Sequence, residues 1–138
     1  MWAQTLTDIA QIGSQMMTPR QCMGPALEGW GTAKEYSVAR MKRSLDQCDI
    51  VIAARNSAGE LIGISRALSD FATTTKILDV VIAPEYQRQG LGQAMMKRIA
   101  AQAKGTSIYF ETERKNFVFA AKCGYAKRPG LTVFRKKG

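Results

Sequence analysis

The chain has 138 residues, a formal net charge of +9, 46% hydrophobic residues and no histidine. Its length predicts one domain over residues 1–138, and its composition excludes a disordered or fibrous protein. The absence of histidine excludes Ser-His and Cys-His nucleophilic catalysis and most transition-metal sites, so acid–base chemistry must come from carboxylates, tyrosine, cysteine, lysine, the backbone or water.

The N-terminal part of the sequence is typical of two helices joined by a loop. Apolar residues at helical spacing predict helices over residues 7–17 and 33–45, and two prolines mark residues 18–32 as a loop. The N-terminal stretch lacks an early basic cluster followed by an apolar core, and no apolar run approaches the roughly 20 residues that span a bilayer. We therefore expect a cytoplasmic protein without a membrane partner.

The remainder of the sequence alternates strands and helices. Two β-branched runs around Asn56–Gly59 predict an antiparallel hairpin over residues 49–68. The elements expected after it are a strand over 76–82, a helix over 91–103, a strand over 106–112, a short helix over 115–123 and a last strand over 131–136. This order predicts a mixed α/β fold (α+β), in which helices flank a central, mostly antiparallel twisted sheet with a right-handed parallel strand–helix–strand crossover over residues 76–112.

Cysteine usage and charge narrow the expected partners. Cys22, Cys48 and Cys123 form no Cys-x-x-Cys pair, which argues against a disulfide framework and a zinc site, so we expect no metal. The charge of +9 favours anionic partners, either phosphates on a small molecule or nucleic acid. A nucleic-acid-binding module has no aromatic–basic motif or recognition helix to support it, and it stays an alternative of a different class.

The stretch "PEYQRQGLGQ", residues 84–93, places two glycines between the strand 76–82 and the helix that follows. A helix N-terminus presents unpaired backbone N–H groups and the positive end of the helix dipole, so the amides of Gln89 through Gln93 could bind one anion beside Arg88. Gly90 and Gly92 would then leave room for that anion. The alternative is that Gly90 only tightens the turn and Gly92 packs against the sheet. The pattern of a nucleotide P-loop and that of a dinucleotide-binding loop are both incomplete here.

The glycine turn resembles the acetyl-coenzyme A loop of the Gcn5-related N-acetyltransferase (GNAT) family, which reads Gln/Arg-x-x-Gly-x-Gly/Ala after a strand and before a helix. The matching residues are Gln87, Gly90 and Gly92. Residues 66–92 are also similar to a bacterial and plastid subgroup with a comparable Asp-Val-Val run. The order of the elements matches the family over nearly the whole chain.

The resemblance implies an N-acetyltransferase that moves an acetyl group from acetyl-coenzyme A, its co-substrate, to a primary amine by direct attack in a ternary complex. It implies that the pyrophosphate binds the loop amides, that the pantetheine arm pairs with the strand backbone, and that the N–H of Val80 or Val81 polarises the thioester carbonyl. The cofactor-binding residues implied in this way are Val80, Val81, Ile82, Gln87, Arg88, Gln89, Gly90, Leu91, Gly92, Gln93 and Asn116.

Asp79 is our candidate for the general base. It interrupts an apolar strand beside the expected thioester position, where partial burial could raise its pKa toward a working value. The alternative is a solvent-facing or capping carboxylate. Asp70 and Glu111 are weaker candidates, and each could instead bind the substrate ammonium or form a surface ion pair.

The sequence departs from the family pattern at the general acid. The family often places a tyrosine five residues before the aromatic of its Gly-Phe pair, but the aromatic here is Tyr125 and the matching residue is Ala120. Tyr125 or Cys123 could replace that tyrosine if its side chain faces the cleft. The alternative is that both pack in the core beside Phe117. The asparagine that often begins this helix is matched by Glu113, although Asn116 could take its place if the helix starts one turn later.

The missing tyrosine leaves two functions open, an active acetyltransferase and an acyl-coenzyme A-binding regulator with little or no turnover. The family builds its acceptor site from loops and the first two helices, which correspond to residues 18–36 with Glu28 and Trp30. The sequence does not specify the amine. The family resemblance also implies a homodimer as one assembly.

Overall fold

The computed structural model describes residues 2–4 and 38–138. The helix predicted over residues 7–17 and the loop that follows it lie outside the described residues, as do Glu28, Trp30 and residues 33–37 of the second predicted helix.

A mixed five-stranded sheet forms the centre of the fold, with the strands in the spatial order β1-β2-β3-β4-β5. Neighbouring strands are antiparallel except for β4 and β5, which are parallel and are connected through a helix, so the predicted fold class is confirmed. The first strand was not predicted, because three residues are too few to show an alternating pattern. The strands are β1 (Trp2–Gln4), β2 (Ile50–Asn56), β3 (Leu61–Ser69), β4 (Thr74–Ile82) and β5 (Ser107–Tyr109).

The predicted β2–β3 hairpin is confirmed, and Asn56 organises its turn. The side-chain oxygen of Asn56 accepts the N–H groups of Ala58 and Glu60 at 3.0 and 2.9 Å. Gly59 adopts a left-handed conformation with φ of 83°, which glycine reaches without a Cβ penalty. This turn fixes the β2–β3 register, in which Val51 of β2 lies opposite Arg66 of β3.

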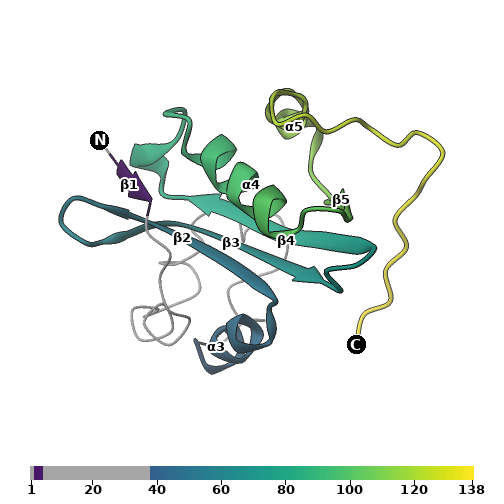
Figure 1. Ribbon diagram of the computed structural model, residues 1–138, viewed down its shortest axis with the longest axis horizontal. Coiled ribbons are helices and arrows are strands. Elements are labelled where there is room, and N and C mark those ends of the chain that lie inside the picture. Colours follow the sequence, from purple (N-terminus) through teal and green to yellow (C-terminus); the bar gives the residue numbers. More distant parts are fainter. Residues whose placement is uncertain (1, 5–37) are drawn as a thin grey trace.

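Helices cover both faces of the sheet (Figure 1). On one face lies α3, and on the opposite face lies α4, which precedes β5 along the chain. Among the described residues, no helix has the length and hydropathy needed to cross a membrane. The helical elements are α3 (Val38–Gln47), the 3-10 turn η2 (Pro84–Tyr86), α4 (Leu91–Gln102), the 3-10 turn η3 (Arg114–Asn116) and α5 (Phe117–Lys122).

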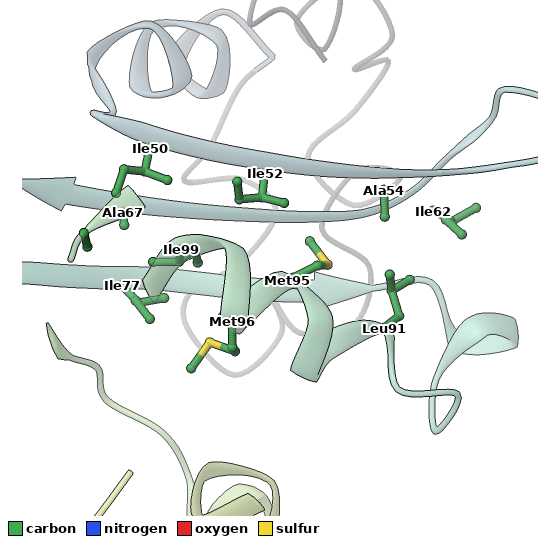
Figure 2. Close-up of a cluster of buried hydrophobic side chains, with 11 residues drawn as sticks. Ile50, Ile52, Ala54, Ile62, Ala67, Ile77, Leu91, Met95, Met96 and Ile99 are labelled. Carbon is green, nitrogen blue, oxygen red and sulfur yellow. The ribbon is translucent and has the colours of Figure 1, made fainter. Parts of the chain in front are cut away.

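The larger hydrophobic cluster lies between α4 and the sheet (Figure 2). The residues predicted to step by four along one helix face, Leu91, Met95, Ile99 and Ala103, are all buried at 1% exposure or less. They pack against β2 side chains such as Ile50 and Ile52. Each large apolar side chain buried in this way contributes about 1.5–3 kcal/mol, so this stripe anchors α4 and the turn before it onto the sheet. A smaller cluster around Leu45 joins α3 to the other face.

Two predicted strands differ from the structure. The strand expected over residues 106–112 is only three residues long, because β5 ends at Tyr109. The last strand expected over residues 131–136 is wrong, since these residues belong to no strand and run as an extended segment after α5 (Figure 1). A sequence with high strand propensity becomes a strand only when another strand supplies hydrogen-bond partners, and this segment has none among the described residues of its own chain.

Candidate functional site

The edge of β4 opens where β5 ends. The two strands pair only over Thr74–Lys76 and Ser107–Tyr109, whereas β4 continues to Ile82. Among the described residues, no strand therefore pairs with the β5-facing edge of residues 77–82. We call this part of the sheet the open edge.

The register of β3 and β4 decides which backbone groups face the open edge. Ala83 donates its N–H to Ile62 at 2.8 Å, and antiparallel pairs alternate between bonded and non-bonded. Val81 therefore directs its polar groups at β3, while Val80 and Ile82 direct theirs at the open edge. The Ile82 carbonyl accepts from the side-chain amide of Gln87 at 3.0 Å. Of the two amides expected to polarise a thioester, only that of Val80 faces the opening.

The glycine turn, residues 87–93, joins the open edge to the first turn of α4. Gly90 is the residue before the helix and has φ of 83°, and Arg88 has φ of 61°. A left-handed non-glycine residue costs about 1–2 kcal/mol, so the surrounding structure holds this backbone path against an intrinsic preference. Successive residues of this kind aim their amides into one concave surface that suits an anion.

The amides of Leu91, Gly92 and Gln93 begin α4, where no carbonyl of a preceding helical turn is available. The N-cap residue is Gly90, which has no side chain that could cap this helix. These N–H groups and the positive end of the helix dipole face the exposed part of the turn, which fits a phosphate group. The Gln87 amide is different, because it donates to the Pro84 carbonyl at 3.3 Å. The candidate anion-binding part of the turn is thereby narrowed to residues 88–93.

The two glycines of the turn serve different purposes. A Cβ on Gly90 would meet nothing within 4 Å, so its requirement is the left-handed backbone. A Cβ on Gly92 would lie 2.9 Å from Cε2 of Phe119 and 3.2 Å from Cδ1 of Ile82. Gly92 thus packs against α5 and β4, as the second of the two interpretations expected. The left-handed backbone of Gly90 and the close packing of Gly92 are both compatible with an anion bound at this turn.

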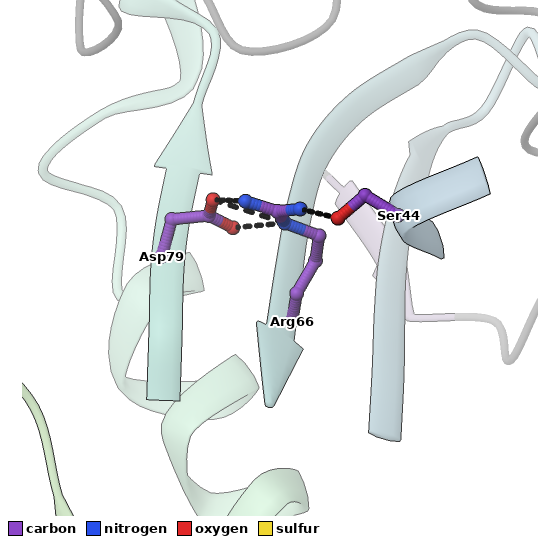
Figure 3. Close-up of polar contacts among 3 residues, drawn as sticks. All are labelled: Ser44, Arg66 and Asp79. Atoms are coloured by element: carbon purple, nitrogen blue, oxygen red, sulfur yellow. Dashed lines mark hydrogen bonds and ion pairs between the residues drawn. The ribbon is translucent and has the colours of Figure 1, made fainter. Parts of the chain in front are cut away.

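Asp79 is ion-paired across the sheet (Figure 3). The Arg66 Nε donates to the two Asp79 carboxylate oxygens at 3.1 and 3.0 Å, and an Arg66 Nη donates to the second of them. The side chains are only 13% and 17% exposed, and Arg66 Nη1 also donates to the Ser44 hydroxyl of α3 at 2.6 Å. The carboxylate is therefore neither solvent-facing nor a helix cap, and it is charge-paired rather than isolated in an apolar environment.

Arg66 is the site residue that the sequence interpretation missed. It lies on β3 within an otherwise apolar run, and the hairpin register places it directly opposite Asp79. A partly buried cation opposite a partly buried carboxylate could have been found by aligning the two strands around their turn. A register irregularity between Arg66 and Ala67 lies beside the pair, so the ion pair also fixes the bulged part of β4.

Tyr125 and Cys123 pack against the larger hydrophobic cluster, as one of the two interpretations expected, but Phe117 is not part of that cluster. The Tyr125 ring stacks edge-on against Phe110, with centroids 4.9 Å apart and planes at 84°, on the α4 side of the sheet. Burial, with a smaller contribution from Cys123, raises the pKa of Tyr125 and keeps its hydroxyl protonated. Burial also raises the pKa of the Cys123 thiol. The expected neighbour Phe117 is instead 40% exposed, and Lys127 Nζ lies 5.4 Å from its ring centroid.

Asn116 lies directly before α5, and Ala120 lies within it. Asn116 donates its side-chain amide to the Thr112 hydroxyl at 3.0 Å, without capping the helix. The Ala120 carbonyl accepts the Tyr125 N–H at 3.1 Å. The helix therefore presents a methyl group at the position of the usual tyrosine.

Two further acidic residues are already engaged. The Asp70 carboxylate accepts from three backbone N–H groups and from the Thr73 hydroxyl, which lowers the pKa of Asp70. Glu111 forms an ion pair with Lys76 beside the point where β4 and β5 part. No three His, Cys, Asp or Glu side chains of the described residues come together in a group that could hold a metal ion.

The open edge of β4 and the N-terminus of α4, which Gly90 precedes, together form the candidate site. The family model described as "Acetyltransferase (GNAT) family" matches residues 15–125. The chain belongs to the GNAT acetyltransferase family. This GNAT chain is 30% identical over 108 residues to serotonin N-acetyltransferase 2, chloroplastic, of Oryza sativa, covering 71% of this chain and 54% of the relative.

Another relative of this GNAT chain is GCN5-related N-acetyltransferase 3, chloroplastic, of Arabidopsis thaliana, at 36% identity over 84 residues, or 56% of this chain and 34% of the relative. The chain thus spans about half the length, or less, of these curated relatives. Glucosamine-6-phosphate N-acetyltransferase from Arabidopsis thaliana superimposes with a TM-score of 0.73 at 12% identity, covering 100% of this chain and 98% of the other. That likeness shows a shared fold.

Proposed function

We propose that the protein is an N-acetyltransferase that moves an acetyl group from acetyl-coenzyme A to a primary amine by direct attack in a ternary complex. One observation carries this proposal: the open edge of β4 leads directly into the uncapped N-terminus of α4. An extended amide-containing chain ending in a pyrophosphate matches such a site, because a strand edge pairs with amides and a helix N-terminus binds phosphate.

The residues divide between two tasks. The amides of Arg88 to Gln93 would hold the pyrophosphate, with the Arg88 guanidinium beside it. The backbone of Val80 and Ile82 would pair with the pantetheine amides along the open edge. The Val80 N–H would then stabilise the negative charge that develops on the thioester oxygen.

The chemistry requires an amine that has lost its proton. The amine nitrogen attacks the thioester carbonyl carbon, the C–S bond breaks, and the coenzyme A thiolate leaves and takes up a proton. Asp79 is our candidate to receive the amine proton, directly or through a water molecule. Its pairing with Arg66 fixes the orientation of the carboxylate.

The acceptor class rests on chemistry and on the names of similar proteins. Serotonin and glucosamine-6-phosphate, which occur in two of those names, each carry a primary amine. We propose a primary amine here without naming the molecule. The cytoplasmic location expected from the sequence stays a prediction.

The test measures free thiol released from acetyl-coenzyme A in the presence of serotonin, glucosamine-6-phosphate, a polyamine and a lysine peptide, each offered separately. We expect release that depends on one of these amines and produces its acetamide by mass spectrometry. In the same assay Asp79→Asn should shift or abolish the pH dependence of kcat, while the affinity for acetyl-coenzyme A stays unchanged.

The second candidate is an acyl-coenzyme A-binding regulator, which the methyl group of Ala120 at the usual tyrosine position favours. One experiment distinguishes the enzyme from the regulator. Tight binding of acetyl-coenzyme A by calorimetry without thiol release on any amine supports the regulator and contradicts the enzyme. No binding of acetyl-coenzyme A contradicts both.

A further inference from the structure

Tyr86 joins the 3-10 turn before the glycine turn to a distant part of the sheet. It is the last residue of η2, and its hydroxyl accepts a hydrogen bond from Asn56 Nδ2 at 3.1 Å. Asn56 is the last residue of β2, where the β2–β3 turn begins. This contact between residues 30 positions apart ties η2 to the tip of the hairpin.

Asn56 uses its whole side-chain amide. The carbonyl oxygen accepts the N–H groups of Ala58 and Glu60, and the amino group donates to a Glu60 carboxylate oxygen at 2.7 Å and to the Tyr86 hydroxyl. A primary amide has two donor hydrogens and two acceptor positions, so its capacity is filled. The bonds within the hairpin turn fix the orientation of the amide, and Tyr86 therefore meets a donor that is already oriented.

Further hydrogen bonds connect η2 to the sheet and to the glycine turn. The Tyr86 N–H donates to the Ala83 carbonyl at 2.9 Å, and the Ala83 N–H donates to β3. The side-chain amide of Gln89 donates to the Glu85 carbonyl at 3.2 Å. The Tyr86 ring also packs against the larger hydrophobic cluster. The position of η2 therefore determines where the glycine turn starts.

The backbone of the glycine turn makes that starting point important. Residues 87–90 connect η2 to α4, and two of them, Arg88 and Gly90, have φ of 61° and 83°. The buried stripe of α4 holds one end of this connection on the sheet, so its path depends on how the other end is held. A strained backbone persists only where the surrounding structure determines it. If η2 moves, the amides of residues 88–93 lose the common direction that an anion requires.

We propose that Asn56 and Tyr86 are positioning residues for the acetyl donor. Their hydrogen bond holds η2 against the hairpin tip and thereby keeps the glycine turn in the conformation that binds the pyrophosphate. The bond is partly buried, where it is stronger than in water. Neither residue belongs to the glycine turn. The inference rests on the proposed function, because it concerns the binding of acetyl-coenzyme A at that turn.

The first test is Tyr86→Phe, which removes the hydroxyl and keeps a ring in the hydrophobic cluster. Calorimetric titration should give an affinity for acetyl-coenzyme A about fivefold weaker, in keeping with the loss of one neutral hydrogen bond. The KM for acetyl-coenzyme A should rise by a similar factor while kcat stays unchanged, because the proposed role concerns donor binding alone.

Asn56→Asp is the matched control. A carboxylate still accepts the N–H groups of the hairpin turn, and it can accept a hydrogen bond that the Tyr86 hydroxyl now donates. The exposed Glu60 side chain can turn away from the new charge. The affinity of Asn56→Asp for acetyl-coenzyme A should therefore stay within about twofold of that of the unsubstituted chain.

Asn56→Ala separates positioning from a general loss of stability. This variant removes both the bond to Tyr86 and the acceptor of the hairpin turn. It should weaken acetyl-coenzyme A binding about as much as Tyr86→Phe does, and it should add nothing to that loss in the Tyr86→Phe background. Its lower thermal midpoint should persist in that background, because the hairpin turn loses its acceptor in either case. Two affinity losses that simply add would contradict the proposal.

Hydrogen exchange tests the same contact without acetyl-coenzyme A. The N–H groups of Tyr86 and Gln87 donate to carbonyls at the start of η2, so they should exchange about fivefold faster in Tyr86→Phe. The amides of residues 95 and 96 within α4 should not change. If Tyr86→Phe leaves either the affinity or this exchange unchanged, this inference alone is overturned. If the unsubstituted chain binds no acetyl-coenzyme A, the proposed function fails and this inference fails with it.

Discussion

Two turns bracket β4, and they satisfy their backbone N–H groups in opposite ways. In the Asp70 turn, residues 69–74, one carboxylate oxygen of Asp70 accepts from the N–H groups of Ala72, Thr73 and Thr74 at 2.9, 2.8 and 2.9 Å. In the glycine turn, the first N–H groups of α4 have no carbonyl of a preceding helical turn to bond, and Gly90 at the N-cap has no side chain that could cap the helix. The first turn supplies its own anion, whereas the second leaves that place to a ligand.

The backbones of the Asp70 turn and the glycine turn share one feature. Each turn contains one non-glycine residue in the left-handed region, Phe71 with φ of 55° and Arg88 with φ of 61°. Left-handed residues turn neighbouring amides toward one point, which an anion then fills. The difference teaches that strain alone does not identify a binding site. The state of the amides, satisfied or free, is what separates a structural turn from a candidate ligand site.

The largest effect should come from giving the glycine turn an internal carboxylate. Gly90→Asp adds a negative charge where the pyrophosphate would bind, so its affinity for acetyl-coenzyme A should fall on the order of 100-fold, since hydrogen bonds to charged groups contribute about 1.5–3 kcal/mol each. Gly59→Asp is the matched control, because Gly59 has the same φ of 83° and a Cβ there also meets nothing within 4 Å. Calorimetric titration that gives both variants the same affinity would contradict the comparison.

Gly92→Ala should reduce stability by about 1–3 kcal/mol, because the new Cβ would lie 2.9 Å from the Phe119 ring and force repacking. Urea unfolding measures this cost. In a Phe119→Ala background, Gly92→Ala should lower the free energy of unfolding by less than it does in the unsubstituted chain. Strict additivity of the two substitutions would show that Phe119 is not the group that excludes a side chain at residue 92.

Asp70→Ala should lower the thermal midpoint at neutral pH, because the turn loses the carboxylate that its N–H groups share. The folded-state pKa of Asp70 is lowered by those hydrogen bonds, so the stabilisation is present above the unfolded pKa of about 4 and is lost as pH falls further, through the folded pKa. The gap between the two midpoints should therefore stay constant from pH 7 to about 4 and narrow below it. A gap that widens in acid would contradict this account. Acetyl-coenzyme A affinity should not change.

The smallest effects should come from relieving the strain that both turns share. Phe71→Gly and Arg88→Gly should each change the free energy of unfolding by no more than about 1 kcal/mol, since relief of the left-handed conformation is offset by a more flexible unfolded chain. Only Arg88→Gly should weaken acetyl-coenzyme A binding, because it alone removes a cation beside the glycine turn. Equal affinities for the two variants would remove Arg88 from the proposed site.

Local patterns in the sequence determined most of the fold. The four-residue stripe from Leu91 to Ala103 predicted α4, and the turn residues around Asn56 predicted the β2–β3 hairpin, because short-range spacing alone specifies these elements. The Gln-x-x-Gly-x-Gly pattern likewise located the turn before α4. Its resemblance to the GNAT family agreed with the family match over residues 15–125.

Contacts between distant residues decided the rest. The pairing of Asp79 with Arg66, the packing of Phe119 over Gly92 and the stacking of Tyr125 on Phe110 each join separate elements, so no local pattern contains them. The same reason explains the predicted strand at residues 131–136 that did not form. Propensity is a property of the segment itself, whereas a strand needs a partner, and only the tertiary structure shows whether the chain supplies one.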